Sequence, residues 1–278
     1  MKKLFLLMLA GLFITSCASK NNAEQAEEPA KKVLVLYYSI TNTTKQMAEY
    51  IQQKTGADIE LIEPVNAYST EYGEIIARSG EEREGNVLPE LKPQKSNLND
   101  YDIIFLGYPI WFGTYAQPMK TLLASGALNG KTVVPFCTSG SSGVAESVAD
   151  LKKAVSGIQI PASVGVRSSL MDKMPAAVDR VLISLGLMEG ENEALADYSA
   201  QQPVTEAEAE IFNKAISTYP MLQGAKAVSV GSRTTSKGTD YLFKGESAGP
   251  GGASSVMDVY VTKENNGTDP YFTGIDRF

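Results

Sequence analysis

Hydroxyl side chains gather in one short segment near the start of the chain. Residues 39–44 read SITNTT, directly after an apolar run and directly before an amphipathic one. The unpaired amides and the dipole of a helix N-terminus bind anions, and hydroxyls add neutral donors. These donors suit a phosphate monoester held without a metal. The segment is not a Walker loop, because the G-x-x-x-x-G-K-[ST] pattern is absent. The alternative is an ordinary Ser/Thr helix cap, although a cap needs only one such residue.

Two further segments have compositions that suit a flat ligand. Residues 108–115, YPIWFGTY, form an apolar and aromatic stretch that contains the only Trp of the chain. A flat aromatic ligand could lie on such a surface while backbone amides bind its edge. Residues 137–143, CTSGSSG, are small enough to let the backbone approach a ligand closely. The alternatives are a loop that packs on the core for the first segment and a solvent-exposed loop for the second.

These segments follow predicted strands in a regular alternation of strand and helix. Residues 33–39, VLVLYYS, form a near-continuous apolar run, which is typical of a strand buried on both faces. Strands are predicted at 33–39, 58–65, 101–110, 131–140 and 163–166, and helices at 44–56, 72–83, 117–125, 144–155 and 177–185. This pattern predicts an α/β fold with a doubly wound, five-stranded parallel sheet. The strands' carboxyl ends then share one edge, where such sheets bind ligands, so segments 39–44, 108–114 and 137–143 should meet.

The composition excludes several kinds of function. The formal charge of the 278 residues is −7, which argues against nucleic acid as a partner, because binding its phosphates needs clustered Lys and Arg. The chain contains no His. This excludes Ser-His-Asp and Cys-His nucleophile schemes and removes the commonest metal ligand. We therefore expect no catalytic side chain and no metal site.

The N-terminus has the pattern of an export signal. Residues 1–17 read MKKLFLLMLAGLFITSC, a basic pair followed by an apolar run too short to span a bilayer. Residues 14–17 resemble a bacterial lipobox, which implies cleavage before Cys17 and lipidation of that residue; the alternative is a plain signal peptide. Residues 18–30 are polar and acidic, as in a flexible tether. We expect an exported protein, lipid-anchored to a bacterial membrane and facing the periplasm or the cell surface.

Together the three polar segments resemble the flavodoxin family, specifically its bacterial flavodoxin-like branch. The family's first loop follows (S/T)-x-T-G-x-T, and residues 39–44 match all but the Gly, which is Asn42 here. Its second loop often reads G-Y-P-I-W-W-G, and residues 107–113 differ at one aromatic position. Its third loop often reads T-S-G-G-S-G, which residues 138–143 match closely. The resemblance covers residues 31–187, and each motif follows a predicted strand.

This resemblance implies FMN as the cofactor and a role for each loop. The first loop would hold the FMN phosphate, the second would contact the isoalloxazine ring, and the third would contact its pyrimidine edge and ribityl side. The residues that this implies are Ser39, Thr41, Asn42, Thr43, Thr44, Pro109, Ile110, Trp111, Phe112, Gly113, Thr138, Ser139, Gly140, Ser141 and Ser142. Asn42 is the main departure from the family pattern, and Asn tolerates left-handed backbone angles better than most residues.

Two functions remain open from the sequence. The first is a membrane-anchored FMN protein that carries electrons or reduces small acceptors such as quinones, with a protein or small molecule as electron donor and acceptor. The second is a non-redox docking lipoprotein on a degenerate flavodoxin scaffold, which Asn42 and the predicted tether favour. A G-x-G-x-x-G fingerprint for NAD(P)H is absent. Cys137 has no neighbouring cation in the sequence that would lower its thiol pKa, so we interpret it as a small core residue.

The second half is predicted to form a small domain of its own. Residues 188–204 have the composition of a linker, and residues 205–208, TEAE, form a capping box ahead of an amphipathic helix. Strand-like runs follow at 225–235, 239–246, 255–264 and 270–278, the last two joined by the hairpin signal Asn266-Gly267. One helix followed by an antiparallel sheet predicts an α+β domain at 205–278, loosely similar to a cystatin-like fold. We see no catalytic constellation in it and expect it to dock a protein partner.

Overall fold

The structure is a computed structural model that describes residues 31–193, 195–248 and 254–277. The predicted signal peptide at 1–17, its Cys17 and the predicted tether at 18–30 lie outside the described residues. From Lys31 onward the chain groups into one compact unit. Two sheets organise this unit, and they are in contact with each other.

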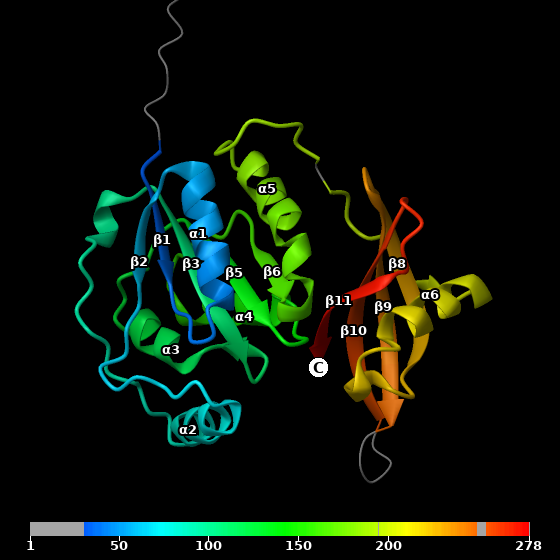
Figure 1. Ribbon diagram of the computed structural model, residues 1–278, viewed down its shortest axis with the longest axis horizontal. Coiled ribbons are helices and arrows are strands. Elements are labelled where there is room, and N and C mark those ends of the chain that lie inside the picture. Colours follow the sequence, from blue (N-terminus) through cyan, green and yellow to red (C-terminus); the bar gives the residue numbers. More distant parts are fainter. Residues whose placement is uncertain (1–30, 194, 249–253, 278) are drawn as a thin grey trace, which may run out of the picture. The chain divides into compact units, whose positions relative to one another are not determined.

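A parallel sheet organises the first half of the chain (Figure 1). Its strands run in the order β2-β1-β3-β5-β6, and every neighbouring pair is parallel. These strands are β1 (Val33–Tyr37), β2 (Asp58–Leu61), β3 (Ile103–Trp111), β5 (Val133–Ser139) and β6 (Val164–Arg167). Every residue of β1 and β5 is buried, which explains their continuous apolar sequences. The predicted five-stranded parallel sheet is confirmed.

Helices cover both faces of this sheet, as the doubly wound prediction requires. They are α1 (Thr43–Thr55), α2 (Tyr72–Glu84), α3 (Gln117–Ala124), α4 (Ala145–Ala154) and α5 (Met174–Ser184), with short 3-10 helices η1 (Leu98–Asp100) and η2 (Ser168–Lys173). Alternate side chains of a strand point to opposite faces. Leu36 of β1 therefore packs in one core with α3 and α4, whereas Val35 packs in a second core with α1 and α5.

The helix ends follow local sequence signals. α1 ends at Gly56, which has a φ of 66° and forms the left-handed cap that glycine favours. α5 begins at Met174, three residues before the predicted start at residue 177. The reason is Pro175 in its first turn, where a missing backbone N–H breaks no helical hydrogen bond and the fixed φ suits a helix.

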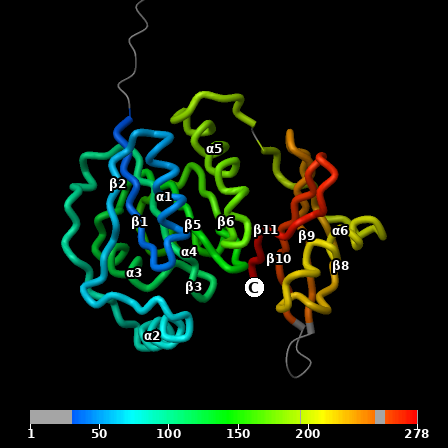
Figure 2. The backbone as a smooth tube through the Cα atoms, in the orientation of Figure 1, coloured from blue at the N-terminus to red at the C-terminus, as the bar shows by residue number. Residues whose placement is uncertain are grey.

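The second half forms one α-helix and an antiparallel sheet, as predicted. Its elements are α6 (Glu206–Ile216), η3 (Pro220–Leu222), β7 (Gln202–Pro203), β8 (Lys226–Thr235), β9 (Gly238–Ala248), β10 (Ser254–Glu264) and β11 (Tyr271–Arg277). The strand order is β11-β10-β9-β8-β7, so β11 is an edge strand (Figure 2). The Thr205 hydroxyl accepts from the Glu208 amide and the Glu208 carboxylate accepts from the Thr205 amide, which confirms the predicted capping box. Phe212 of α6 packs on Phe243 of the sheet.

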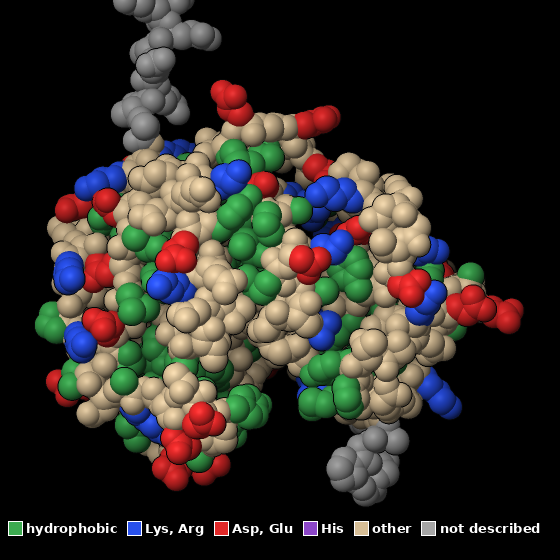
Figure 3. Space-filling view, viewed as in Figure 1, with side chains coloured by type: hydrophobic (Ala, Val, Ile, Leu, Met, Phe, Trp, Pro, Cys, Tyr) green, Lys and Arg blue, Asp and Glu red, His purple; other side chains and the backbone are tan. Residues whose placement is uncertain are grey.

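Charged side chains of both signs are spread over the surface. On the face that Figure 3 shows, Asp and Glu are interspersed with Lys and Arg. Exposed ion pairs such as Lys92–Glu63, at 3.2 Å, belong to this surface and each contributes little to stability. No helix among the described residues combines the length and the apolar character needed to cross a membrane.

The centre of the parallel sheet gives a first prediction. Gly107 of β3 is aligned with Tyr37 of β1 and Phe136 of β5, and an added Cβ would lie 2.1 Å from the Phe136 ring. We expect Gly107→Ala to lower the free energy of unfolding by about 1–3 kcal/mol, because overpacking forces buried side chains out of their preferred positions. Gly73→Ala, whose added Cβ meets no atom within 4 Å, should be neutral or slightly stabilising. Urea unfolding compares the two variants, and equal stabilities would contradict this account.

Candidate functional site

The three predicted loops leave the same edge of the parallel sheet. The hydroxyls of Thr44 and Thr138 lie 2.8 Å apart in a buried hydrogen bond, which joins the first loop to the third. Pro109 of β3 is aligned with Thr138 of β5, so the second loop leaves the sheet beside the third. The strand order reverses between β1 and β3. Open parallel sheets bind ligands at such a reversal, outside the carboxyl ends of the strands.

Asn42 takes the backbone conformation that the first loop requires. Its φ of 62° and ψ of −4° are left-handed, and it is the residue that immediately precedes α1. Glycine adopts such angles freely, and Asn is among the few other residues that do so with modest strain. The Asn42 side chain is exposed and makes no capping hydrogen bond. The substitution that distinguishes this loop from the family pattern therefore preserves the backbone turn.

The first loop offers several unpaired hydrogen-bond donors at the start of α1. The Ser39 hydroxyl accepts from the Lys45 amide at 3.3 Å. Within the part of the chain that the structure describes, the amides of Thr41, Thr43 and Thr44 have no acceptor. Thr41 and Thr43 also place their hydroxyl oxygens 3.3 Å apart. Amides and hydroxyls at a helix N-terminus fit a phosphate group without a metal ion.

The second loop is a tight hairpin that the sequence analysis did not predict. β3 turns back into β4 (Thr114–Tyr115), and Trp111 pairs with Thr114 across the turn. The two turn residues, Phe112 and Gly113, have φ values of 51° and 83°. Positive φ at both central residues is the pattern of a type I′ turn. It is uncommon for a bulky residue such as Phe112, and strained residues of this kind cluster at functional sites.

The aromatic side chains of the second loop have different surroundings. The Trp111 ring meets Tyr38 and Tyr68 with centroid distances of 5.9 Å and 5.3 Å, yet it is only partly buried. Phe112 is 42% exposed, and its ring lies 5.1 Å from the Arg83 guanidinium. Trp111 is therefore held in place by the core while part of its surface stays accessible to a ligand.

All the carbonyls of the third loop between Ser139 and Ser142 accept hydrogen bonds. The donors are the Ser168 hydroxyl to Ser139 at 3.2 Å, Arg167 Nε to Gly140 at 3.1 Å, the Ile275 amide to Ser141 at 2.9 Å and the Ser139 hydroxyl to Ser142 at 2.6 Å. Among the described residues, the amides of Gly140, Ser141 and Ser142 have no acceptor. The loop thus has its acceptors satisfied by the protein and its donors available. Such a loop fits the acceptor-rich edge of a heterocycle.

Cys137 lies at the base of this loop and is fully buried. Burial raises the pKa of the Cys137 thiol, and the nearby Asp276 adds to the rise. The thiol therefore stays protonated at neutral pH, which agrees with its interpretation as a small core residue. No three His, Cys, Asp or Glu side chains in the described part of the chain are grouped so that they could hold a metal ion.

Two carboxyl groups beside the loops were not singled out from the sequence. Glu146 of α4 has an oxygen 2.9 Å from where a Cβ on Gly113 would lie, and Asp276 of β11 has one 2.8 Å from the corresponding position on Gly143. Burial raises the pKa of Glu146, and Asp150 and Asp276 add to the rise. Glu146 follows the third motif closely, which was an available signal. Asp276 is distant in sequence, and no local pattern could have placed it there.

Asp276 yields a prediction on pH dependence. Its side chain is 3% exposed, and neither carboxyl oxygen has a partner at hydrogen-bond geometry among the described residues. Burial raises the pKa of Asp276 above its ordinary value of 3.8, and Asp258 adds to the rise, although the nearby Tyr260 hydroxyl lowers it. A raised pKa in the folded state means that stability is lost as the pH rises from the ordinary pKa through the raised one. We expect Asp276→Asn to melt at a higher temperature than the wild type at neutral pH and to lose this advantage near pH 3.8.

The control for this prediction is Asp172→Asn, at an exposed position, which should leave the pH dependence of the melting temperature unchanged. Thermal unfolding of all three proteins across the acidic and neutral range makes the comparison. A melting temperature of Asp276→Asn that parallels the wild type at every pH would show that the buried carboxyl does not oppose folding.

A comparison with protein families identifies the first half of the chain. Residues 32–175, just over half of the 278 residues, match the family model described as flavodoxin. The chain belongs to the flavodoxin family. Flavodoxin is itself a reference example of ligand binding where the strand order 2-1-3-4-5 reverses, with FMN bound at that point. When the five strands of the parallel sheet are numbered without the short β4, this chain has the same strand order and the same reversal point. FMN is accordingly the cofactor that the family assignment supports.

Several solved structures are similar to this chain over the same half. A protein from Bacteroides eggerthii DSM 20697, assigned as a flavoprotein, is 32% identical and covers 54% of this chain and 96% of its own, with a TM-score of 0.45. A flavoprotein in complex with FMN from Lactobacillus acidophilus NCFM is 28% identical, over 52% and 99%, with a TM-score of 0.45. A protein from Bacteroides uniformis ATCC 8492, also assigned as a flavoprotein, is 27% identical, over 54% and 99%, with a TM-score of 0.48. Because these scores lie below 0.5, the family assignment rests on the family match.

Proposed function

We propose that the protein binds FMN in its three loops and uses it to transfer electrons or to reduce small acceptors such as quinones. The observation that carries the proposal is the set of amide donors in the first and third loops that have no acceptor among the described residues. The left-handed Asn42 supports it, because the turn that presents the first set is intact. When bound, FMN supplies reversible transfer of one or two electrons.

Each loop has a separate part in this proposal. The amides of Thr41, Thr43 and Thr44 and the hydroxyls of Thr41 and Thr43 bind the phosphate, where the α1 dipole favours negative charge. Trp111 and Phe112 supply apolar surface for the ring and exclude water from it. The free amides of the third loop orient the ring through its polar edge. No side chain has to act as a nucleophile in such a reaction.

The non-redox alternative, a docking lipoprotein on a degenerate scaffold, is weaker on two counts. Its main support in the sequence was Asn42, and Asn42 keeps the backbone angles of a glycine turn. The donors of the third loop also have no acceptor within the described part of the protein, and a scaffold that binds nothing would not need them.

The proposed electron transfer is tested with FMN-loaded protein. We expect the purified protein to take up FMN, and the flavin bleached anaerobically by dithionite to regain its absorbance when p-benzoquinone is added. About one quinone should be consumed per flavin, because each exchanges two electrons. Protein that takes up no FMN, or that stays reduced in the presence of quinone, would overturn the proposal. Adding NADH in place of dithionite distinguishes an enzyme with a soluble donor from a carrier that needs a protein donor.

We also propose that the protein is exported and anchored through lipid on Cys17, on the strength of the signal pattern at residues 1–17. A lipid anchor would hold the flavodoxin half beside a membrane, where lipid-soluble quinones occur. Cys17→Ser should either release the protein into the soluble fraction or leave it as an unprocessed precursor. A Cys17→Ser protein with the same processed mass and the same membrane fraction as the wild type would contradict lipidation at this residue.

A further inference from the structure

The edge strand of the C-terminal sheet pairs with the third loop. The Ile275 amide donates to the Ser141 carbonyl and the Gly143 amide donates to the Ile275 carbonyl, both at 2.9 Å. Ser142 and Ile275 thereby form a parallel bridge outside the regular strands. Edge strands expose unpaired N–H and C=O groups that bind another extended segment. Here the segment that binds to β11 is the third loop, which we expect to contact the pyrimidine side of FMN.

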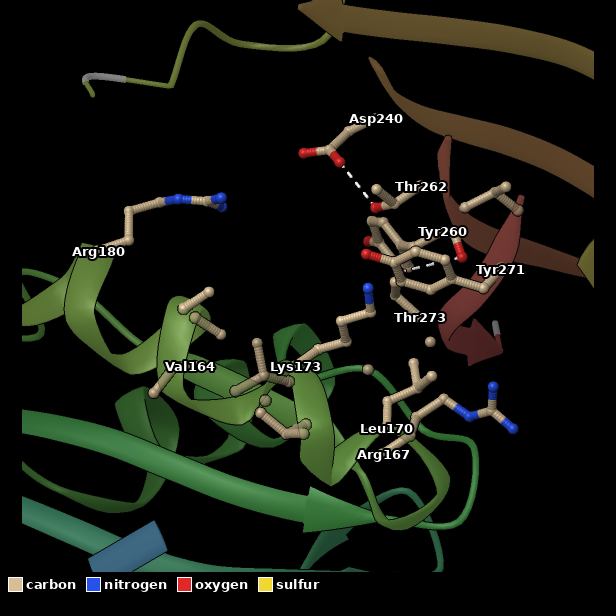
Figure 4. Close-up of a pocket in the computed structure, with 18 of the residues that line it drawn as sticks. Val164, Arg167, Leu170, Lys173, Arg180, Asp240, Tyr260, Thr262, Tyr271 and Thr273 are labelled. Atoms are coloured by element: carbon tan, nitrogen blue, oxygen red, sulfur yellow. Dashed lines mark hydrogen bonds between the residues drawn. The ribbon is translucent and has the colours of Figure 1, made fainter. Parts of the chain in front are cut away.

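Arg167 makes a second connection between the same two parts. It lies at the end of β6, and its Nε donates to the Gly140 carbonyl at 3.1 Å while its Nη1 donates to the Phe272 carbonyl at 2.6 Å. Its guanidinium also lies 4.1 Å from the centre of the Phe272 ring. Arg167 is labelled at the rim of a cavity of about 730 Å³ between β6, α5 and the C-terminal sheet (Figure 4). A planar guanidinium can bind two carbonyls at once, which a single ammonium cannot do in the same geometry.

Gly274 brings β11 into backbone contact with the loop. A Cβ on Gly274 would lie 3.1 Å from Gly143 Cα and 3.4 Å from Gly143 N. The atoms that it would meet belong to the loop backbone, which can yield only by moving the loop. Gly274 therefore offers a way to displace the loop slightly without removing a hydrogen-bonding group.

We propose that the C-terminal sheet is a positioning element for the flavin site, acting through β11 and Arg167 on the third loop. The inference rests on the proposed binding of FMN. With the carbonyls of the loop held from Ser139 to Ser142, its peptide planes cannot rotate, and the free amides of Gly140 to Ser142 stay directed at the ligand. Preorganised donors bind more tightly because they lose less freedom on binding. Residues 205–278 then contribute to the cofactor site although they supply none of its proposed direct contacts.

Two variants of the full chain test this, each with a matched control. Arg167→Gln should weaken FMN binding by about tenfold, the effect expected when one charge-assisted hydrogen bond is lost. Gly274→Ala should weaken FMN binding by about the same factor, because its added Cβ displaces the loop. Gly245→Ala places its Cβ in the same sheet against the flexible Met257 side chain. Lys173→Gln breaks another contact between the two halves, the Lys173–Glu264 ion pair at 2.8 Å, which does not involve the third loop. Both controls should bind FMN within about twofold of the wild type.

Two readouts separate positioning from a general loss of structure. The midpoint potential of the bound FMN should shift in Gly274→Ala and Arg167→Gln and stay unchanged in the controls. Without FMN, amide hydrogen exchange at Gly143, which donates to Ile275, should become faster in the same two variants only. Wild-type affinity and potential in both test variants would overturn the inference while the proposed function stands. A wild type that binds no FMN would overturn both, and unchanged exchange at Gly143 would separately show that β11 does not hold the loop.

Discussion

The close packing of Phe136 on Gly107 at the centre of the parallel sheet is the contact on which the site depends. Gly107 of β3 has Tyr37 of β1 on one side and Phe136 of β5 on the other. Because Gly107 has no side chain, the Phe136 ring occupies the space above β3. This arrangement aligns three strands whose carboxyl ends lead into the three loops. A shift of one strand by a single residue would exchange its two faces and separate the loops.

The site built on this edge relies on backbone amides rather than on reactive side chains. The first and third loops contain amides with no acceptor in the described part of the chain, and the Thr44–Thr138 hydrogen bond joins those loops directly. Asn42 keeps the left-handed backbone angles that a glycine would adopt at this position of the family pattern. The absence of His does not argue against such a site, because the redox chemistry of a flavin belongs to the cofactor.

The sequence predicted the elements well and their long-range contacts poorly. Buried parallel strands have continuous apolar sequences, and Gly56 and the Thr205 capping box are local signals. These parts could therefore be predicted without a structure. The Phe112-Gly113 turn was not, because Phe rarely adopts a positive φ. The pairing of Ile275 with the third loop also could not be predicted, since it depends on how two sheets pack and leaves no periodic pattern in the sequence. The C-terminal half, which we expect to dock a protein partner, also contacts the third loop of its own chain.

The most direct test of this account uses the single Trp of the chain, which lies in the second loop. Titration with FMN, followed by Trp111 emission, reports binding of the flavin near the second loop. We predict saturable quenching at about one FMN per chain, and weaker binding of riboflavin, which lacks the phosphate that the first loop should hold. No quenching by FMN, or equal affinity for FMN and riboflavin, would contradict the claim that these loops form a flavin phosphate site.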